Sequence, residues 1–247
     1  MEKKTVLFVI PILALILGLV GCGGDLTGGG TKDTYVVYAT LVKNVQTDTA
    51  RIDVLLTRNG DTITTATVAL NNDTLETNTI GYYQTYGAGT IPVNAVYTLS
   101  LVDSTLLDRA ISIRLAGAPI ITNTGFRFYT GSAEAVSWTG GANADGFILA
   151  TMPPASASVD TGYSAYVAVN NGTIPSEAFE LGVNDRIIGM HMIYVAAYNG
   201  APIANTFIPF DLPKLLIPGD NISGSNISGR AAGIVIGLPD SISVSNP

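Results

Sequence analysis

The stretch Ala50-Arg51-Ile52-Asp53-Val54-Leu55-Leu56 decides the fold class, together with Tyr35-Val36-Val37-Tyr38-Ala39-Thr40-Leu41 before it. Both runs are rich in β-branched and aromatic residues and follow a period of two, which is typical of half-buried β-strands. Polar Asn, Gln, Thr and Asp residues separate them. Asn59-Gly60 then stands between the second run and the next one, and this dipeptide is a strong hairpin signal. This part of the chain therefore predicts an antiparallel β-structure.

Three further runs extend this pattern, at residues 62–70, 96–102 and 109–115. The turn Asn71-Asn72-Asp73 follows the first of them. The region contains about seven short strands within about 80 residues and no convincing amphipathic helix, which is the count and spacing of an immunoglobulin-like sandwich. We expect an all-β fold and place the first β-sandwich domain at residues 34–116.

A second set of strands follows Gly117-Ala118-Pro119-Ile120, which reads as an interdomain joint. Three of its stretches resemble a fibronectin type III module: 135–139 with Trp138, 146–149, and 191–200, where Val195, Ala197 and Asn199 match the penultimate strand. His191 stands where that family has its corner tyrosine. The resemblance implies a second, fibronectin type III-like sandwich at 117–238, followed by a C-terminal tail at 239–247.

Two tetrapeptides recur at one offset of 83 residues. Gly-Thr-Ile-Pro occurs at 89–92 and again at 172–175, and Gly-Ala-Pro-Ile occurs at 117–120 and again at 200–203. Tandem duplication of a sandwich domain would leave such an offset. Coincidence in a chain rich in Gly, Ala, Thr and Ile is the alternative.

The N-terminus has the three parts of a secretory signal: the basic start Met1-Glu2-Lys3-Lys4, the apolar run 6–20, and small residues. Leu19-Val20-Gly21-Cys22 resembles the lipobox of bacterial lipoproteins. The resemblance implies that residues 1–21 are a cleaved signal peptide and that Cys22 carries diacylglycerol, often with an acylated amino group. The alternatives are an ordinary signal peptide or a spanning helix, which needs about 20 apolar residues.

Residues 22–33 are rich in glycine and predict a flexible tether between the lipid and the first strand. In the lipoprotein family an Asp after the cysteine signals inner-membrane retention. Here the position holds Gly23, which favours the outer membrane. Without residues 1–21 the formal net charge moves from −7 to −8, because Lys3, Lys4 and Glu2 are lost. No lysine occurs between Lys43 and Lys214, which argues against nucleic acid as a partner.

Few residues suggest chemistry. His191 is the only histidine, and its alternation with Ile193 predicts that it points inward and hydrogen-bonds a backbone group. A zinc site of the usual kind needs more His or Cys ligands. Glu177 and Glu180 are a candidate carboxylate pair, although a solvated acidic loop is the favoured interpretation. The Asp and Asn oxygens of the turn at 71–73 could hold calcium, but the absence of an Asp-x-Asp-x-Asp-Gly loop argues against it.

Tyr82, Tyr83 and Tyr86 are the candidate ligand-contact aromatics, because sugar-binding modules and protein interfaces both present such rings. The favoured interpretation is that one or two of them fill the sandwich core and the rest lie on the surface of a strand, and Trp138 is most simply the core tryptophan of the second sandwich. We expect no catalytic residues, no metal and no cofactor.

The sequence thus predicts a lipid-anchored envelope protein that acts, without catalysis, as a structural, adhesion or protein-interaction module. Its envelope partner, whether a protein or a polysaccharide, is not specified by the sequence. One alternative is a carbohydrate-binding lipoprotein for polysaccharide capture, which exposed coplanar tyrosines would favour. The other is a carboxylate-dependent hydrolase.

Overall fold

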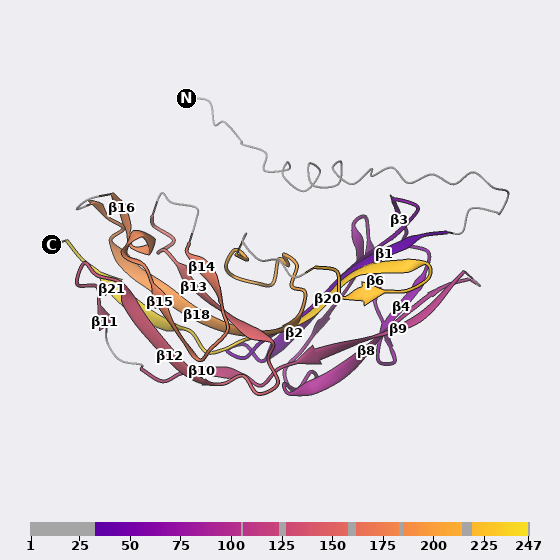
Figure 1. Cartoon of the computed structure of the whole chain (residues 1–247), viewed down its shortest axis with the longest axis horizontal. Coiled ribbons are helices and arrows are strands. Elements are labelled where there is room, and N and C mark those ends of the chain that lie inside the picture. Colours follow the sequence, from indigo (N-terminus) through magenta and orange to yellow (C-terminus); the bar gives the residue numbers. More distant parts are fainter. Residues whose placement is uncertain are drawn as a thin grey trace, which may run out of the picture. The chain divides into compact units, whose positions relative to one another are not determined.

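The computed structural model describes residues 33–104, 106–123, 127–157, 162–182, 185–213 and 219–246. The predicted signal peptide, Cys22 and nearly all of the predicted tether lie outside these residues. In the described part, regular structure is β-strand except for one 3-10 turn, η1 (Ser176–Ala178). The prediction of an all-β fold is confirmed (Figure 1).

The strands, in chain order, are β1 (Tyr35–Asn44), β2 (Thr49–Arg58), β3 (Asp61–Thr62), β4 (Thr67–Leu70), β5 (Asp73–Thr74), β6 (Glu76–Asn78), β7 (Gly81–Tyr86), β8 (Ala95–Asp103), β9 (Leu107–Leu115), β10 (Pro119–Ile121), β11 (Arg127–Phe128), β12 (Glu134–Gly140), β13 (Gly146–Met152), β14 (Ser164–Val167), β15 (Asn171–Ile174), β16 (Glu180–Gly182), β17 (Asp185–Arg186), β18 (Gly189–Gly200), β19 (Ile222–Ser223), β20 (Ile227–Ile236) and β21 (Asp240–Val244). A 12-stranded sheet has the main order β11-β21-β18-β20-β1-β2-β7-β6, with β13 beside β18 and β14 beside β13. We call it the long sheet. The smaller sheets are β5-β4-β8-β9, β10-β12-β15 and β16-β17.

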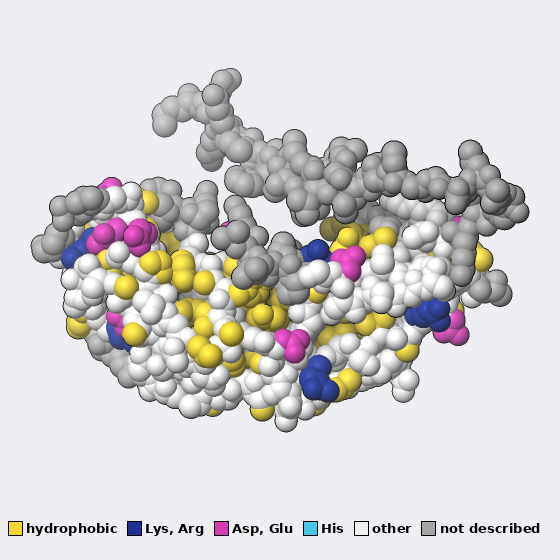
Figure 2. Space-filling view, viewed as in Figure 1, with side chains coloured by type: hydrophobic (Ala, Val, Ile, Leu, Met, Phe, Trp, Pro, Cys, Tyr) yellow, Lys and Arg dark blue, Asp and Glu magenta, His cyan; other side chains and the backbone are white. Residues whose placement is uncertain are grey.

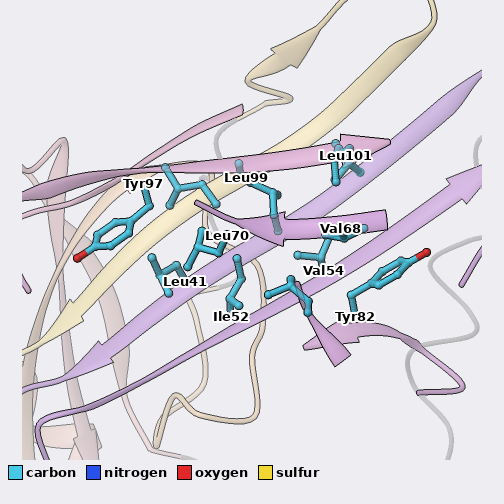
Figure 3. Packing of buried hydrophobic residues seen from close by; sticks show 14 of the residues in the cluster. Leu41, Ile52, Val54, Val68, Leu70, Tyr82, Tyr97, Leu99 and Leu101 are labelled. Carbon is cyan, nitrogen blue, oxygen red and sulfur yellow. The ribbon is translucent and has the colours of Figure 1, made fainter. Parts of the chain in front are cut away.

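The first sandwich packs one half of the long sheet against β5-β4-β8-β9. Because side chains alternate along a strand, Leu41 of β1 and Ile52 of β2 point to the same side, where they meet Leu70 and Leu99 (Figure 3). These four side chains are at most 1% exposed. Burying a side chain of this size stabilises the fold by about 2 kcal/mol, so this alternation accounts for the first core.

The second sandwich packs the other half of the long sheet against β10-β12-β15. Its cluster includes Trp138 of β12, which is 2% exposed and lies edge-on to Phe147 of β13 at a centroid distance of 5.4 Å. Val195 and Ala197 of β18 lie in the same cluster. The expected core position of Trp138 is therefore what the structure shows.

Strand β20 belongs to both halves of the long sheet. It pairs in parallel with β1 along its whole length, and antiparallel with β18 over Ile236 to Ala232. Its residues Ile227, Ala231 and Val235 lie in the first core. Residues 33–247 form one compact unit. The predicted boundary at residue 117 follows the end of β9, and as a domain limit it stays a prediction.

The C-terminal residues differ from the expected tail. Strand β21 pairs antiparallel with β18 from Gly189–Val244 to Ile193–Asp240, and its Ile242 and Val244 are buried in the second core. The short Ser-Ile-Ser-Val alternation supplies two core side chains and explains why this segment is ordered into the sheet.

Candidate functional site

The long sheet has a second apolar surface on the side turned away from the two sandwich cores, which we call the outer face. Residues 201–213, which we call the strap, run over this face between β18 and β19 (Figure 1). Ile208 and Phe210 of the strap pack in a third cluster with side chains of β1, β13, β18 and β20: Val42, Ile148, Ala150, Ala196, Ile234 and Ile236. The outer face of the central strands is therefore itself a core.

Local hydrogen bonds and ring contacts fix the strap. Asn205 accepts the backbone N–H of Phe207 through its Oδ1 at 2.8 Å, and the N–H of Ile208 bonds to the Asn205 carbonyl at 3.0 Å. The Phe210 ring lies 5.5 Å from that of Tyr194 on β18. An Asx turn of this kind lets a segment without regular structure keep one shape.

Beyond the strap, the outer face carries every methionine of the predicted mature chain. Met190 and Met192 lie on β18, and Met152 on β13 is the register partner of Met192. Ser243 of β21 pairs with Met190 on one side and with Phe128 of β11 on the other. Phe128 and Met190 are therefore separated by two strand spacings, about 10 Å. We call Phe128, Met152, Met190 and Met192 the methionine face.

This face is partly open to solvent. Phe128 is 61% exposed and Met190 is 43% exposed, whereas Met152 and Met192 are half-buried. Figure 2 shows apolar side chains gathered over the second sandwich, while the charged groups on the visible side are scattered in small sets. The sequence-based reasoning missed the methionine face because Met152 is 38 residues from Met190, and only the sheet register brings them together.

The three candidate tyrosines do not form one exposed aromatic surface. Tyr82 and Tyr86 lie in the first core at 2% and 5% exposure, and the Tyr82 hydroxyl accepts the N–H of Ala66 at 2.9 Å. Tyr83 points to the other side of β7, where the Arg51 guanidinium lies 5.1 Å from its ring centroid. Burial raises the pKa of Tyr86 to about 12. The suggestion of three exposed coplanar rings is therefore corrected: two of them fill the core.

His191 has the structural role expected for it. Its side chain is buried, its Nε2 lies 2.8 Å from the Ile187 carbonyl oxygen, and its ring meets that of Phe179 edge-on at 5.3 Å. Its Nδ1 has no partner in the described part of the chain. Desolvation holds the pKa of His191 below its ordinary value.

Glu177 and Glu180 have separate surroundings. Glu180 accepts the Tyr129 hydroxyl at 2.9 Å and lies 3.9 Å from Arg186, while Glu177 is exposed beside Ser176. Burial, and then the bond to Glu180, raise the pKa of Tyr129 to about 12. The bond between Glu180 and Tyr129 thus connects β16 to the segment after β11, so the role of Glu180 is structural.

The Asn71-Asn72-Asp73 turn is likewise held by its own backbone. Asn71 has φ 54° and accepts the N–H of Thr98 at 2.9 Å through its side chain. Among the described residues, no three His, Cys, Asp or Glu side chains gather as a metal ion would require. No helix of the described residues is long and apolar enough to cross a membrane.

A buried polar set in the first sandwich was also missed by the sequence reading. Asp103 is 7% exposed and accepts both the Tyr35 hydroxyl at 2.8 Å and the Arg58 guanidinium at 3.0 Å. The three residues come from β8, β1 and β2. Their bonds satisfy a carboxylate that would otherwise be costly to bury, so this set closes one end of the core.

The comparisons with known proteins match this architecture only distantly. No family model and no curated protein matches the chain. Among solved structures, it is similar to the chicken CNTN1 FN1-FN3 domains, with 13% identity over 65% of this chain and a TM-score of 0.30. It spans 59% of the length of that structure. It is also similar to DIP-gamma IG1+IG2 (7% identity, 87% of this chain and 97% of that one, TM-score 0.24). It is similar as well to three N-terminal domains of the bacteriophage RB49 outer capsid protein Hoc, with 9% identity over 87% of this chain and 71% of that one and a TM-score of 0.27.

Proposed function

We propose that the chain is a lipid-anchored bacterial envelope protein that acts, without catalysis, as a protein-interaction module docking through the methionine face. The observation that carries the docking surface is the exposure of Phe128 and Met190 on the outer face, beside Met152 and Met192. Aromatic side chains and methionine are enriched at protein interfaces. The unbranched, polarizable methionine side chain adapts to varied partner surfaces.

The methionine face is suited to docking because its methionines lie on paired strands. Met190 and Met192 belong to a 12-residue strand that is paired with β13 on one side and with β20 and β21 on the other. Docking would therefore bury apolar area without ordering a loop, and so would avoid much of the entropy cost of association. The partner surface that fits is apolar and belongs to a protein.

The anchor rests on Cys22 and on the residues that follow it. Eleven residues, 23–33, separate the cysteine from Thr34, and an extended chain of that length reaches about 36 Å. That slack would let the sandwiches turn toward a partner in the envelope, in the outer membrane if Gly23 has the meaning that the lipoprotein resemblance gives it.

The anchor is tested by Cys22→Ser in cells fed labelled palmitate. We expect the variant to take up no label, to keep its full precursor length and to leave the membrane fraction. Lipid labelling equal to that of the natural chain would overturn the assignment of Cys22.

The docking surface is tested by the paired change Met190→Lys and Phe128→Lys in the lipidated chain. Ile120→Lys is the matched control, because Ile120 is 55% exposed on β10 in the opposite sheet of the same sandwich. The readout is the size of the membrane-extracted complex on native gels. We expect the paired change to release a monomer and the control to preserve the complex. Equal behaviour of the two variants would contradict the proposal.

A further inference from the structure

A polar cleft of about 380 Å³ lies where the edge strand β9 meets the end of β18 and the middle of β20. It is separate from the methionine face. Its walls come from β8, β9, β18, β20 and the residues beside them, and the polar side chains among them are Ser112, Arg114, Asp145, Asn199 and Asn221. The volume is within the range of small-molecule sites, about 300–1,000 Å³.

One side chain in this cleft has an unmet hydrogen-bonding need. Asn199 is only 8% exposed, and its Nδ2 has no acceptor among the described residues. A buried donor without an acceptor costs free energy, because folding has removed it from water. Asn199 also lines the cleft, so a ligand oxygen that reaches its amide would satisfy it.

Two opposite charges line the same cleft. No carboxylate in the described part of the chain lies within ion-pairing distance of Arg114, which leaves its guanidinium donors available. Asp145 accepts the backbone N–H of Gly200 at 2.8 Å, and this bond holds its carboxylate at the cleft. The two charges cancel, so the cleft has both donors and acceptors but no net charge.

Hydrogen bonds and a close backbone contact fix part of the cleft wall. The Asn221 side chain makes two bonds of 2.8 Å to the backbone N–H and carbonyl of Ala231. At Gly233 of β20, an added Cβ would overlap the Arg114 carbonyl oxygen, so the backbones of β9 and β20 are in direct contact. The cleft is therefore preformed.

We propose that this cleft binds one neutral, hydroxyl-rich unit, the size of a monosaccharide. Each sugar hydroxyl both donates and accepts, so a sugar can satisfy the Asn199 amide and the Arg114 guanidinium while donating to Asp145. A simple anion would satisfy the two donors but would meet the Asp145 charge. The proposal moves carbohydrate recognition away from Tyr82, Tyr83 and Tyr86, and it does not depend on docking through the methionine face.

The test is a titration of the full lipidated chain, isotopically labelled, in a detergent without a sugar head group. The probes are D-glucose, D-galactose and N-acetyl-D-glucosamine, each up to about 100 mM, well above the roughly 1 mM of a weak site. Glycine and glutamate are the charged probes. The readout is the side-chain amide signals of Asn199 and Asn221 together with the backbone signals of 231–233.

We expect at least one sugar to shift these signals to saturation, and neither amino acid to do so. Arg114→Ala should weaken the apparent affinity about tenfold or more, as loss of a charged hydrogen bond predicts. Arg109→Ala, on the same strand but outside the cleft, should leave it unchanged. The proposal is overturned if no sugar shifts the signals, if only glycine or glutamate does, or if the two arginine variants behave alike.

Discussion

The two sandwiches share the long sheet but differ in which polar side chains they bury and which apolar side chains they expose. In the first, Asp103 is buried and takes hydrogen bonds from Tyr35 and Arg58 at the end of the core. In the second, Met190 and Phe128 on the outer face are partly exposed, beyond the part that the strap covers. This difference is why we place the proposed docking surface on the second sandwich.

Strand β20 contributes side chains to both halves of the long sheet. It contributes Ala231 and Val235 to the first core, and Ile234 and Ile236 to the cluster under the strap. A strand with both faces buried links the stability of one sandwich to that of the other, because its loss would expose both sets of side chains.

The largest expected effect comes from matched core truncations in the two sandwiches. Trp138→Ala should destabilise the chain by about 4 kcal/mol and Leu99→Ala by about 3 kcal/mol, from lost burial and the cavities left behind. Because β20 is shared, we expect each variant to lower the midpoint of one common transition in urea. Two transitions, of which only one moves in each variant, would break the link between the sandwiches.

The contact between β9 and β20 gives the next prediction. Gly233→Ala would place a Cβ in steric overlap with the Arg114 carbonyl oxygen, so the strands must separate. We expect a loss of about 2 kcal/mol in the free energy of unfolding, as for other overpacked sites. Gly182→Ala is the control, because an added Cβ there meets nothing within 4 Å. A neutral Gly233→Ala would show that the two strands are not in contact.

The polar set of the first sandwich should contribute less. Tyr35→Phe removes the 2.8 Å bond to Asp103 and leaves Arg58 as its remaining side-chain partner. We expect a cost of about 1.5 kcal/mol, measured by urea denaturation at neutral pH. A change below the error of that measurement would mean that the hydroxyl does not help to close the core.

The smallest effect is a pH dependence located in the second sandwich. Burial lowers the pKa of His191 in the folded chain, so between pH 7 and about 5.5 the unfolded chain binds more protons than the folded one. Stability should therefore fall as the pH drops through about 6.5, by at most about 1.4 kcal/mol per pH unit. His191→Leu should flatten this slope, and an unchanged slope would show that other groups cause it.

The sequence predicted the parts of this structure that follow local alternation. The period of two in 35–41 and 50–56 gave the paired strands β1 and β2, and the same alternation placed His191 inward. The sharing of β20 was not predictable, because its Gly-Arg-Ala-Ala-Gly run has no alternation and its partners are remote in the chain.

The site residues show the same limit. Tyr82 and Tyr86 are four positions apart on β7 and so share its buried side, whereas Tyr83 points away; knowing which side is buried requires the opposing sheet. Asn199 was singled out only for its resemblance to a strand position, whereas the cleft that it lines is formed with β9, more than 80 residues earlier in the chain. Tertiary packing, rather than residue type, creates both the methionine face and the cleft.

Site-specific photocrosslinking in intact cells tests the docking claim most directly. A photoreactive residue would replace Met190 on the second sandwich or, as the comparison, Thr85 on the first, since Thr85 is exposed on β7. The account predicts one discrete protein adduct at position 190 that is absent at position 85. Adducts at both positions, or at position 85 alone, would contradict it.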